Sequence, residues 1–360
     1  MSSNVAAPDS IGELSRVMAD AASQRHAIGV RGFGSKAGWA AAGDPVDVTV
    51  DTQRLDRIVE HAAGDLVVTA QAGVPLAVLQ EQLAPARQWL GLDPPEAGAT
   101  VGGVVATAAS GPRRLLFGTP RELLIGITVV LADGTIAHSG GKVVKNVAGY
   151  DLGKLFTGSF GTLGVIAQCT FRLHPLQPVR RVVTAATDDP ASVAERVFAT
   201  GAVPSALEWD GAALTAVFES IESAADTQSA EAAAAIGGEV GDALPAGFGE
   251  RPAGPVLLKL THRLGALREV LALVASHATV SAHVGSGVVW VGAEDLGDLA
   301  ALREAVAAHG GSVVVVGAPA EAKREVDVWG PVRGLPVMRR IKEQFDPDRR
   351  MSPGRFVGGI

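Results

Sequence analysis

Cysteine and aromatic residues are scarce in this 360-residue chain, and each scarcity excludes a class of protein. The single cysteine, Cys169, excludes an intrachain disulfide and an iron–sulfur cluster held by this chain alone, and it favours a reducing compartment. Aromatic residues make up only 4% of the chain, which argues against the stacking platforms that bind single-stranded nucleic acid. The formal net charge of −7 also disfavours a phosphate-backbone partner, so we expect no nucleic acid.

Long apolar runs and a secretory leader are also missing. No uninterrupted apolar stretch approaches the length of about 20 residues that spans a bilayer. Residues 1–10 contain no basic region followed by an apolar core. We therefore predict neither a transmembrane segment nor a signal peptide. With 47% apolar and 19% charged residues the chain is globular, and its length favours two domains or more.

Hydrophobic periodicity changes along the chain. The first part predicts a helix at 9–26, strands at 46–52, 64–74 and 162–175, and a hairpin at 123–140 with an Ala-Asp-Gly turn. After about residue 178, strands alternate with helices, which favours a ferredoxin-like α/β arrangement. The Ala- and Gly-rich segment 222–250 predicts a helix that ends in a loop, and 335–356 predicts a helix with a turn-rich tail. No repeat of fixed period is visible.

The stretch "VRGFGSKAGW" (30–39) follows an apolar segment and has the glycines of a phosphate loop. Gly38 is one position too far for the dinucleotide pattern G-x-G-x-x-G, and turn and strand follow instead of a helix. Ser35 and Lys36 stand in the wrong order for a nucleoside triphosphate loop. Taken alone, the stretch fits an ordinary turn as well as a phosphate site.

Two further glycine clusters change that balance. "GATVGGVVATAASG" (98–111) contains small residues almost throughout, which lets a helix pack closely or a ligand lie along the backbone. "KNVAGYDLGKLFTGSFGTLGVI" (145–166) places Gly158, Gly161 and Gly164 before a strand. Each glycine cluster by itself is weak evidence for a ligand site, but the order of the three clusters and the distances between them form a specific pattern.

These segments, with "FGTPRELLIGITVVLADGTI", together resemble the FAD-binding domain of the vanillyl-alcohol oxidase/p-cresol methylhydroxylase (PCMH) type. Within that family the chain is most similar to the FAD-binding subunits of bacterial glycolate oxidases, and "FDPDRRMSPGRF" (345–356) resembles the end of such chains. The resemblance implies an α+β fold: a PCMH-type FAD-binding domain of two α+β subdomains (1–178), a smaller α/β, ferredoxin-like substrate or cap domain (179–330), and a C-terminal helix and tail returning to the FAD domain (331–360).

The resemblance also implies which residues bind FAD. The loop from Arg31 to Lys36 would surround the pyrophosphate with backbone amide donors, and the small-residue segment would line the flavin and the diphosphate. The last glycine cluster would contact the ribityl, ribose or adenine end. The residues so implied are Arg31, Gly32, Phe33, Gly34, Ser35, Lys36, Pro94, Ala99, Thr100, Val101, Gly102, Gly103, Thr107, Ser110, Gly111, Gly161, Gly164 and Ile166.

Some members of the family attach flavin covalently through a histidine in the first loop. Ser35 stands at that position here, and neither His61 nor His138 matches the motif, so we predict non-covalent FAD.

Catalytic residues are harder to assign. Hydroxy-acid dehydrogenases of the family carry H-x-G-D-G-N-x-H, and the nearest stretch, "SAHVGSGVVW" (281–290), keeps only His283 of its polar residues. Lys145 and Tyr150 are further candidates as proton donors or electrophiles near the flavin, with packing as the alternative role. No spacing typical of a metal site occurs, so we expect none.

Two functional hypotheses follow, with a third behind them. The first is an FAD-carrying subunit of a glycolate-oxidase-like complex, with a larger FAD-linked hydroxy-acid dehydrogenase subunit and an iron–sulfur subunit as partners. The second is a free-standing FAD-dependent oxidoreductase with its own hydroxy-acid or alcohol substrate, and the third is an assembly scaffold with vestigial FAD. We expect a cytoplasmic location, with association at the inner face of the membrane through partners as a variant.

Overall fold

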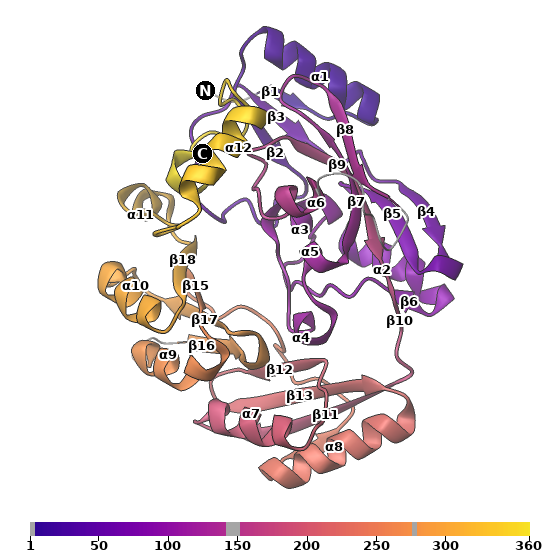
Figure 1. Cartoon of the computed structure of the whole chain (residues 1–360), viewed down its shortest axis with the longest axis vertical. Coiled ribbons are helices and arrows are strands. Elements are labelled where there is room, and N and C mark those ends of the chain that lie inside the picture. Colours follow the sequence, from indigo (N-terminus) through magenta and orange to yellow (C-terminus); the bar gives the residue numbers. More distant parts are fainter. Residues whose placement is uncertain (1–3, 142–151, 276–278) are drawn as a thin grey trace. The chain divides into compact units, whose positions relative to one another are not determined.

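The structure is a computed structural model that describes residues 4–141, 152–275 and 279–360. The chain forms two compact units (Figure 1). The first contains the chain up to Ser110 together with Thr119–Leu176 and Pro331–Ile360. The second contains Gln177–Gly330 and also Gly111–Gly118, a short segment that the sequence pattern does not mark. No helix among the described residues is long and apolar enough to cross a membrane.

A small parallel sheet opens the first unit. Its strands stand in the order β1 (Asn4–Ala6), β3 (Val48–Asp51) and β2 (Ile28–Arg31). Helix α1 (Ile11–Ser23) begins at Ser10, whose hydroxyl accepts a hydrogen bond from the Glu13 amide. Leu14, Met18 and Ala21 form the buried face of α1, as the apolar spacing at 9–26 predicts.

An antiparallel sheet forms the rest of the first unit's framework. Its order is β4 (Ile58–Ala62), β5 (Val67–Gln71), β9 (Val165–Arg172), β7 (Leu124–Val130) and β8 (Ile136–Gly140). Its helices are α2 (Leu76–Leu83), α3 (Val101–Thr107), α5 (Pro120–Leu123) and α6 (Leu152–Phe156). The strands β6 (Gln88–Trp89) and β10 (His174–Pro175) pair separately. The β7–β8 hairpin turns at the predicted Ala-Asp-Gly, where the Leu131 amide donates to the Thr135 carbonyl over 2.9 Å.

Strand β9 is buried on both faces. Its successive residues point in opposite directions and pack into two different apolar clusters. Ile166 packs into one apolar cluster, with α3 and Phe156, whereas Val165 and Ala167 pack into a second cluster with α1. Cys169 also lies in the first cluster, and burial raises the pKa of its thiol far above the ordinary value. The strand that carries Ile166 is therefore fixed in place from both sides.

The second unit contains two successive ferredoxin-like repeats. The first runs β11 (Val179–Ala186), α7 (Pro190–Ala199), β12 (Ala206–Trp209), β13 (Ala213–Ser220), α8 (Glu222–Ile236) and β14 (Glu239–Gly241). The second runs β15 (Val256–Thr261), α9 (Leu267–Val274), β16 (Thr279–His283), β17 (Val288–Ala293), α10 (Leu299–Ala308) and β18 (Ser312–Gly317). Both follow the β-α-β-β-α-β order of that fold. Helix α4 (Arg114–Phe117), from the inserted segment, also belongs to this unit.

The two repeats share one eight-stranded antiparallel sheet, in the order β14-β11-β13-β12-β16-β17-β15-β18. Each half has the same internal order, and the halves join where β12 pairs with β16, with Glu208 opposite His283. The expectation of a ferredoxin-like α/β part is confirmed, but the sequence shows no sign that the arrangement occurs twice. The two copies share a topology without sharing a residue pattern.

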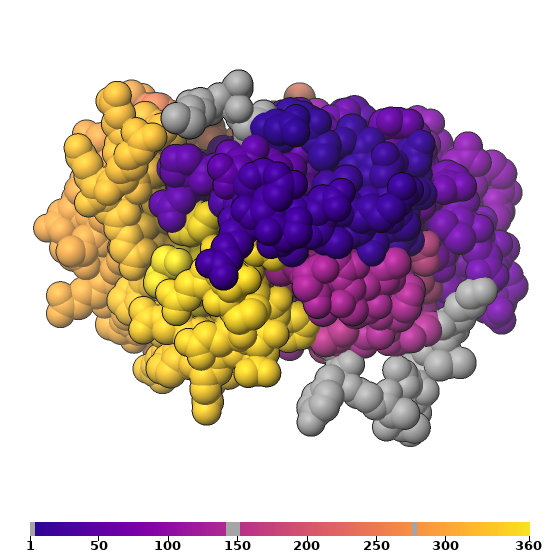
Figure 2. Space-filling model, turned by 90° about the horizontal axis from the view of Figure 1, so that it is seen from above, coloured from indigo at the N-terminus to yellow at the C-terminus, as the bar shows by residue number. Residues whose placement is uncertain are grey.

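The C-terminal segment returns to the first unit, as the resemblance implies. After α11 (Ala320–Glu325) in the second unit, α12 (Leu335–Phe345) and the tail belong to the first. Ile28 and the tail exchange backbone hydrogen bonds, from the Ile28 amide to Arg350 and from the Ser352 amide to Ile28, both 2.7 Å long. Figure 2 shows the C-terminal residues, in yellow, beside the N-terminal ones in indigo. The predicted α+β fold is therefore confirmed.

Buried charges fix this tail. The Lys342 ammonium donates to the Thr162 carbonyl, the Asp346 carboxylate and the Met351 carbonyl, at 2.8, 2.7 and 3.0 Å. Asp346 also accepts from the Arg350 and Met351 amides. Burial lowers the pKa of Lys342, and the bond to Asp346 opposes that shift. The network therefore links α12 and the tail to Thr162, in the turn before β9.

Candidate functional site

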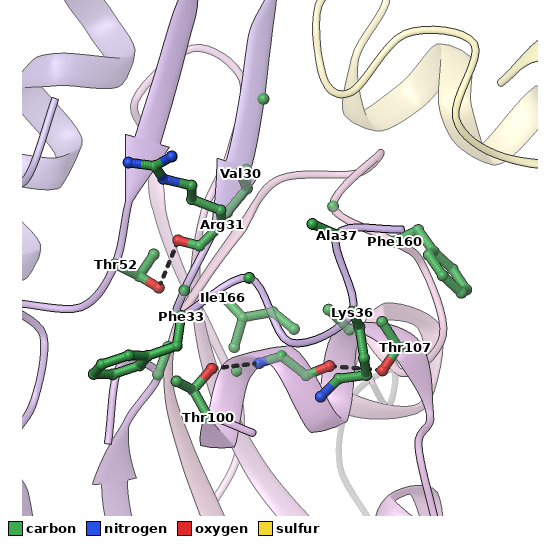
Figure 3. Close-up of a pocket in the computed structure, with 18 of the residues that line it drawn as sticks. Val30, Arg31, Phe33, Lys36, Ala37, Thr52, Thr100, Thr107, Phe160 and Ile166 are labelled. Carbon is green, nitrogen blue, oxygen red and sulfur yellow. Dashed lines mark hydrogen bonds between the residues drawn. The ribbon is translucent and has the colours of Figure 1, made fainter. Parts of the chain in front are cut away.

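The first unit contains a cavity of about 260 Å³ at the ends of the glycine clusters (Figure 3). Three chain segments form most of its wall: the end of β2 with the loop after it, the start and inner face of α3, and the turn before β9. The lining residues are Gly29, Val30, Arg31, Gly32, Phe33, Gly34, Ser35, Lys36, Ala37, Thr49, Thr52, Ala72, Thr100, Gly102, Gly103, Ala106, Thr107, Phe160, Gly161, Gly164, Ile166 and Arg355.

The first loop is a series of turns held by its own backbone. Gly34 has a φ of +77°, which glycine adopts without strain. The Ala37 amide donates to the Gly34 carbonyl over 2.9 Å, and the Trp39 amide donates to the Lys36 carbonyl over 3.1 Å. At the start of the loop, Thr52 Oγ1 donates to the Arg31 carbonyl over 3.2 Å (Figure 3). The loop is therefore a preformed wall.

Helix α3 forms the floor of the cavity and begins at Thr100. The Thr100 hydroxyl accepts from the Gly103 amide over 3.2 Å, and the Thr107 hydroxyl donates to the Gly103 carbonyl over 2.7 Å (Figure 3). Gly102 lies so close to β5's end that a Cβ there would stand 2.6 Å from the Cβ of Ala72. The small residues of 98–111 thus serve close packing here and leave an open wall for a ligand.

The third wall is attached to the second. The Gly158 amide donates to the Val105 carbonyl over 2.9 Å, and the Phe160 amide donates to the Ala106 carbonyl over 2.8 Å. These two bonds hold the turn before β9 against the end of α3. From this turn and the start of β9, three residues line the cavity: Gly161, Gly164 and Ile166. The order and distances of the three clusters in the sequence correspond to three adjoining walls in space.

The C-terminal tail completes the cavity through Arg355. Its Nη2 lies within 3.5, 3.0 and 3.1 Å of the carbonyl oxygens of Lys36, Ala37 and Trp39. Burial lowers the pKa of this guanidinium. The neighbouring Phe356 stacks on Phe160 with ring centroids 5.8 Å apart. One residue of the tail therefore binds the first loop, and the next contacts the third wall.

Most of the residues implied by the resemblance line this cavity, and five do not: Pro94, Ala99, Val101, Ser110 and Gly111. Ala99 and Val101 instead pair with the chain near α2, where the Leu76 amide donates to Ala99 and the Val101 amide to Val74. Gly111 belongs to the second unit. An FAD-binding role for the whole set stays a prediction.

Nine lining residues were not expected from the sequence: Gly29, Val30, Ala37, Thr49, Thr52, Ala72, Ala106, Phe160 and Arg355. Thr49 could have been expected in the site because alternate residues of a strand share one face. Ala106 could have been expected because it lies three positions after Gly103, on the same face of the helix. The basic residue after Ser-Pro-Gly in the tail was the available signal for Arg355.

Of the three catalytic candidates, only His283 falls among the described residues, and it does not line the cavity. Lys145 and Tyr150 fall outside the described residues. His283 ends β16 in the second unit, and its Nδ1 lies 2.5 Å from Glu208 Oε2. The Trp290 indole donates to His283 Nε2 over 3.1 Å, and Arg251 Nη1 lies 3.3 Å from the same atom. Among the described residues, no three His, Cys, Asp or Glu side chains form a metal-binding group.

The first unit thus combines its sheets with a cavity lined by glycine turns and cationic side chains, the kind of wall that suits a dinucleotide. Residues 2–140 match the family model described as "FAD binding domain". The resemblance to the PCMH-type domain is therefore confirmed, and FAD is the cofactor of this domain. The cavity suits that group, since the described residues of its wall combine glycine turns with three cations and include no carboxylate.

The chain is similar to proteins described as oxidoreductases. It is 38% identical to the glycolate oxidase subunit GlcE of Escherichia coli over 158 residues, 43% of this chain and 44% of that one. It is 30% identical to the glycolate oxidase subunit GlcD of Bacillus subtilis over 57% of this chain and 44% of that one. It is 37% identical to a D-lactate dehydrogenase of Archaeoglobus fulgidus over 48% of this chain and 38% of that one.

The chain thus spans less than half the length of these curated relatives. A solved structure, an alkyldihydroxyacetonephosphate synthase, superposes with a TM-score of 0.71 over 98% of this chain and 77% of that one, at 15% identity. That likeness shows the fold alone, which extends through both units.

Proposed function

We propose that this chain is the FAD-binding subunit of a glycolate-oxidase-like 2-hydroxy-acid dehydrogenase complex. In this role it passes electrons between a catalytic flavin subunit and an iron–sulfur subunit, while glycolate loses two electrons and two protons and becomes glyoxylate. Bound FAD supplies the redox chemistry. The first unit of this chain binds and orients that cofactor, and similarity to the glycolate oxidase subunits supports the assignment.

The observation that carries the proposal is the environment of His283. A catalytic base needs a ring nitrogen that can take a proton from the substrate. Glu208 occupies the Nδ1 side, and the indole N–H of Trp290 points at Nε2. Trp290 stands at the position of the second histidine of H-x-G-D-G-N-x-H, counted from His283. The residue that would complete the motif instead engages the histidine that remains.

The single cysteine means that an iron–sulfur cluster of the proposed complex would be held by another subunit. Cys169 lies within the five-stranded sheet, fully buried, and burial raises its pKa, so it offers no thiolate for a metal cluster. Electrons that leave the flavin for a cluster must therefore leave the chain. We propose a hetero-oligomer with a larger FAD-linked dehydrogenase subunit and an iron–sulfur subunit, located in the cytoplasm or at the inner face of the membrane through those partners.

A free-standing FAD-dependent oxidoreductase with its own hydroxy-acid or alcohol substrate is the second candidate. The similarity to a protein described as D-lactate dehydrogenase favours it. In this case the chain needs a base of its own, and the described part of the chain offers His283 only after a change of its hydrogen bonds.

The two candidates are separated by anaerobic reduction of the purified chain. The chain alone should be yellow, should keep its flavin absorbance when glycolate or D-lactate is added, and should bleach with dithionite. Glycolate should bleach it once the larger dehydrogenase subunit is supplied. Bleaching of the isolated chain by either hydroxy acid would establish the free-standing enzyme, and failure to bleach in the presence of the larger subunit would reject the complex.

A further inference from the structure

The C-terminal segment carries a surplus of positive charge in a chain that is otherwise acidic. Residues 333–350 contain six arginines and lysines and three acidic residues, a net formal charge of +3. The whole chain has a formal net charge of −7, so the remainder of the chain carries −10. A local reversal of sign of this kind is typical of a surface that meets a negatively charged partner.

The acidic residues of this segment do not lie beside all of its cations. Each of the three carboxylates lies beside a basic residue of the same segment. The pairs, with the distance between nitrogen and oxygen, are Asp346–Lys342 at 2.7 Å, Glu343–Arg349 at 3.9 Å and Asp348–Arg350 at 3.9 Å. The surplus charge therefore belongs to the other three basic residues, which are Arg333, Arg339 and Arg340.

These three arginines are exposed to solvent, and none of them has a hydrogen bond or an ion pair with another described residue. Arg333 precedes α12, and the other two lie in the middle of this helix. The first turn of α12 has no acidic residue, and a cation near the N-terminus of a helix interacts unfavourably with the helix dipole. The charge of Arg333 therefore contributes no stability to α12.

The opposite side of α12 is fixed to the first unit. Phe345 packs edge to face on Phe156, with ring centroids 5.7 Å apart, and Ile341 packs against the same apolar cluster. Lys342 makes the three buried hydrogen bonds described above. The exposed face of α12 is therefore held in one position before any partner binds, which lowers the entropic cost of association. Figure 2 shows C-terminal residues, in yellow, at the molecular surface.

The chemistry of this face favours a protein over a lipid surface. A guanidinium donates two parallel N–H groups and so matches the geometry of a carboxylate. Among the described residues of α12, Val337 is the one exposed large aliphatic side chain, which offers little apolar area for insertion into a bilayer. An anionic bilayer would also repel the −10 charge of the rest of the chain.

We propose that the exposed face of α12, through Arg333, Arg339 and Arg340, docks on an acidic surface of a partner subunit. The inference rests on the proposed complex and adds which face of this chain takes part and which charge the partner presents. Opposite charges accelerate the encounter of the two proteins, and salt weakens this effect.

The test measures binding of the flavin-loaded chain to the assembled dehydrogenase and iron–sulfur subunits, by titration calorimetry and stopped-flow mixing at several salt concentrations. Arg339→Glu/Arg340→Glu should raise the dissociation constant roughly tenfold or more, mainly through slower association, because like charges then face each other. The salt dependence of binding should become weaker in this variant. Arg339→Lys/Arg340→Lys keeps the charge and should retain most of the affinity.

Arg16→Glu/Arg57→Glu is the matched control. It makes the same change in net charge at two exposed arginines whose side chains also lack a hydrogen bond or ion pair with a described residue. Its affinity for the two subunits should stay within about twofold of the wild type. All three variants should keep the flavin content and the melting temperature of the wild type, since none of the replaced side chains has such a bond within the described part of the chain.

Equal affinity of the wild type and Arg339→Glu/Arg340→Glu would overturn this docking surface and leave the complex intact. An equal loss of affinity in the control would overturn it as well, since total charge and not this face would then decide binding. Absence of binding by the wild type would reject the complex together with its docking surface. Sedimentation with phosphatidylglycerol vesicles, without binding to the subunits, would assign the face to a membrane instead.

Discussion

Trp290 donates its indole N–H to Nε2 of His283 over 3.1 Å, and the two rings meet edge to face. The pair sits beside the joint between the two ferredoxin-like repeats, since Glu208 on β12 lies opposite His283 on β16. The Arg251 guanidinium lies over the indole ring, 3.8 Å from its centroid. The cluster therefore connects the two halves of the second unit through side chains as well as through the sheet.

Replacing Trp290 by phenylalanine keeps an aromatic ring and removes only the donor. We expect Trp290→Phe to lower the free energy of unfolding by about 1–2 kcal/mol, because a buried acceptor on His283 loses a hydrogen bond. Urea unfolding followed by circular dichroism measures the change. Val203→Ala, at an exposed position of the same unit, serves as the control. A Trp290→Phe variant as stable as the wild type would show that the contact contributes nothing to stability.

The floor of the cofactor cavity has no room for a side chain at Gly102. In Gly102→Ala the new Cβ would stand 2.6 Å from the Cβ of Ala72 and 3.1 Å from its carbonyl oxygen. We expect a loss of about 1–3 kcal/mol in unfolding free energy and weaker FAD retention, since α3 must shift away from β5. Gly38→Ala in the first loop has open space and should behave as the wild type. Equal flavin content in all three proteins after gel filtration would contradict this expectation.

Glu219 makes the second unit sensitive to acid. Burial raises the pKa of this carboxyl, but hydrogen bonds from Arg113, at 2.8 Å, and from Ser205 outweigh burial, and the pKa lies below its ordinary value of 4.5. The unfolded chain then takes up a proton at higher pH than the folded one. The stability that the pair supplies is therefore present above pH 4.5 and is lost as the pH falls below it.

Glu219→Gln should remove this part of the pH dependence. Thermal unfolding between about pH 6 and pH 3 should show a shallower decline for the variant than for the wild type, with the difference confined to the acidic side. Glu222→Gln, an exposed change at the start of α8, provides the matched control. Parallel curves for wild type and Glu219→Gln would mean that the ion pair with Arg113 does not link folding to protonation.

The flavin should leave the protein without chemical cleavage. Some members of the PCMH-type family bind flavin covalently through a histidine in the first loop. In this chain Ser35 stands at that position and lines the cavity. Acid precipitation of the holoprotein should therefore release all yellow colour to the supernatant. Colour that stays in the pellet would identify a covalent attachment through another residue.

Most of the residues that line the cavity of the first unit could be predicted from the sequence. Residues 30–39, 98–111 and 158–166 are local clusters, and turns, small residues and strand alternation are read within a few positions. Thr100 and Gly103 were expected in the site, and both line the cavity. The fold was expected because these segments together resemble the PCMH-type FAD-binding domain.

Features that depend on distant contacts were not predictable in this way. Arg355 binds carbonyls 316 to 319 positions earlier, and no local pattern records that approach. The doubling of the ferredoxin-like topology was also missed. Strand β13 reads ALTAVFES whereas its counterpart β17 reads VVWVGA, so the shared order appears only through pairing. β14, three residues within the Ala- and Gly-rich segment, is too short to give a period.

The contact between Arg355 and the loop at Lys36 also affects the order in which the cavity forms during synthesis. Arg355 is the 319th residue that a ribosome adds after Lys36. A nascent chain therefore displays the glycine loop, α3 and the turn before β9 long before the last wall exists. A chain truncated upstream of Arg355 lacks this contact with the first loop, so we expect it to retain less of the yellow cofactor than a chain that includes the residue.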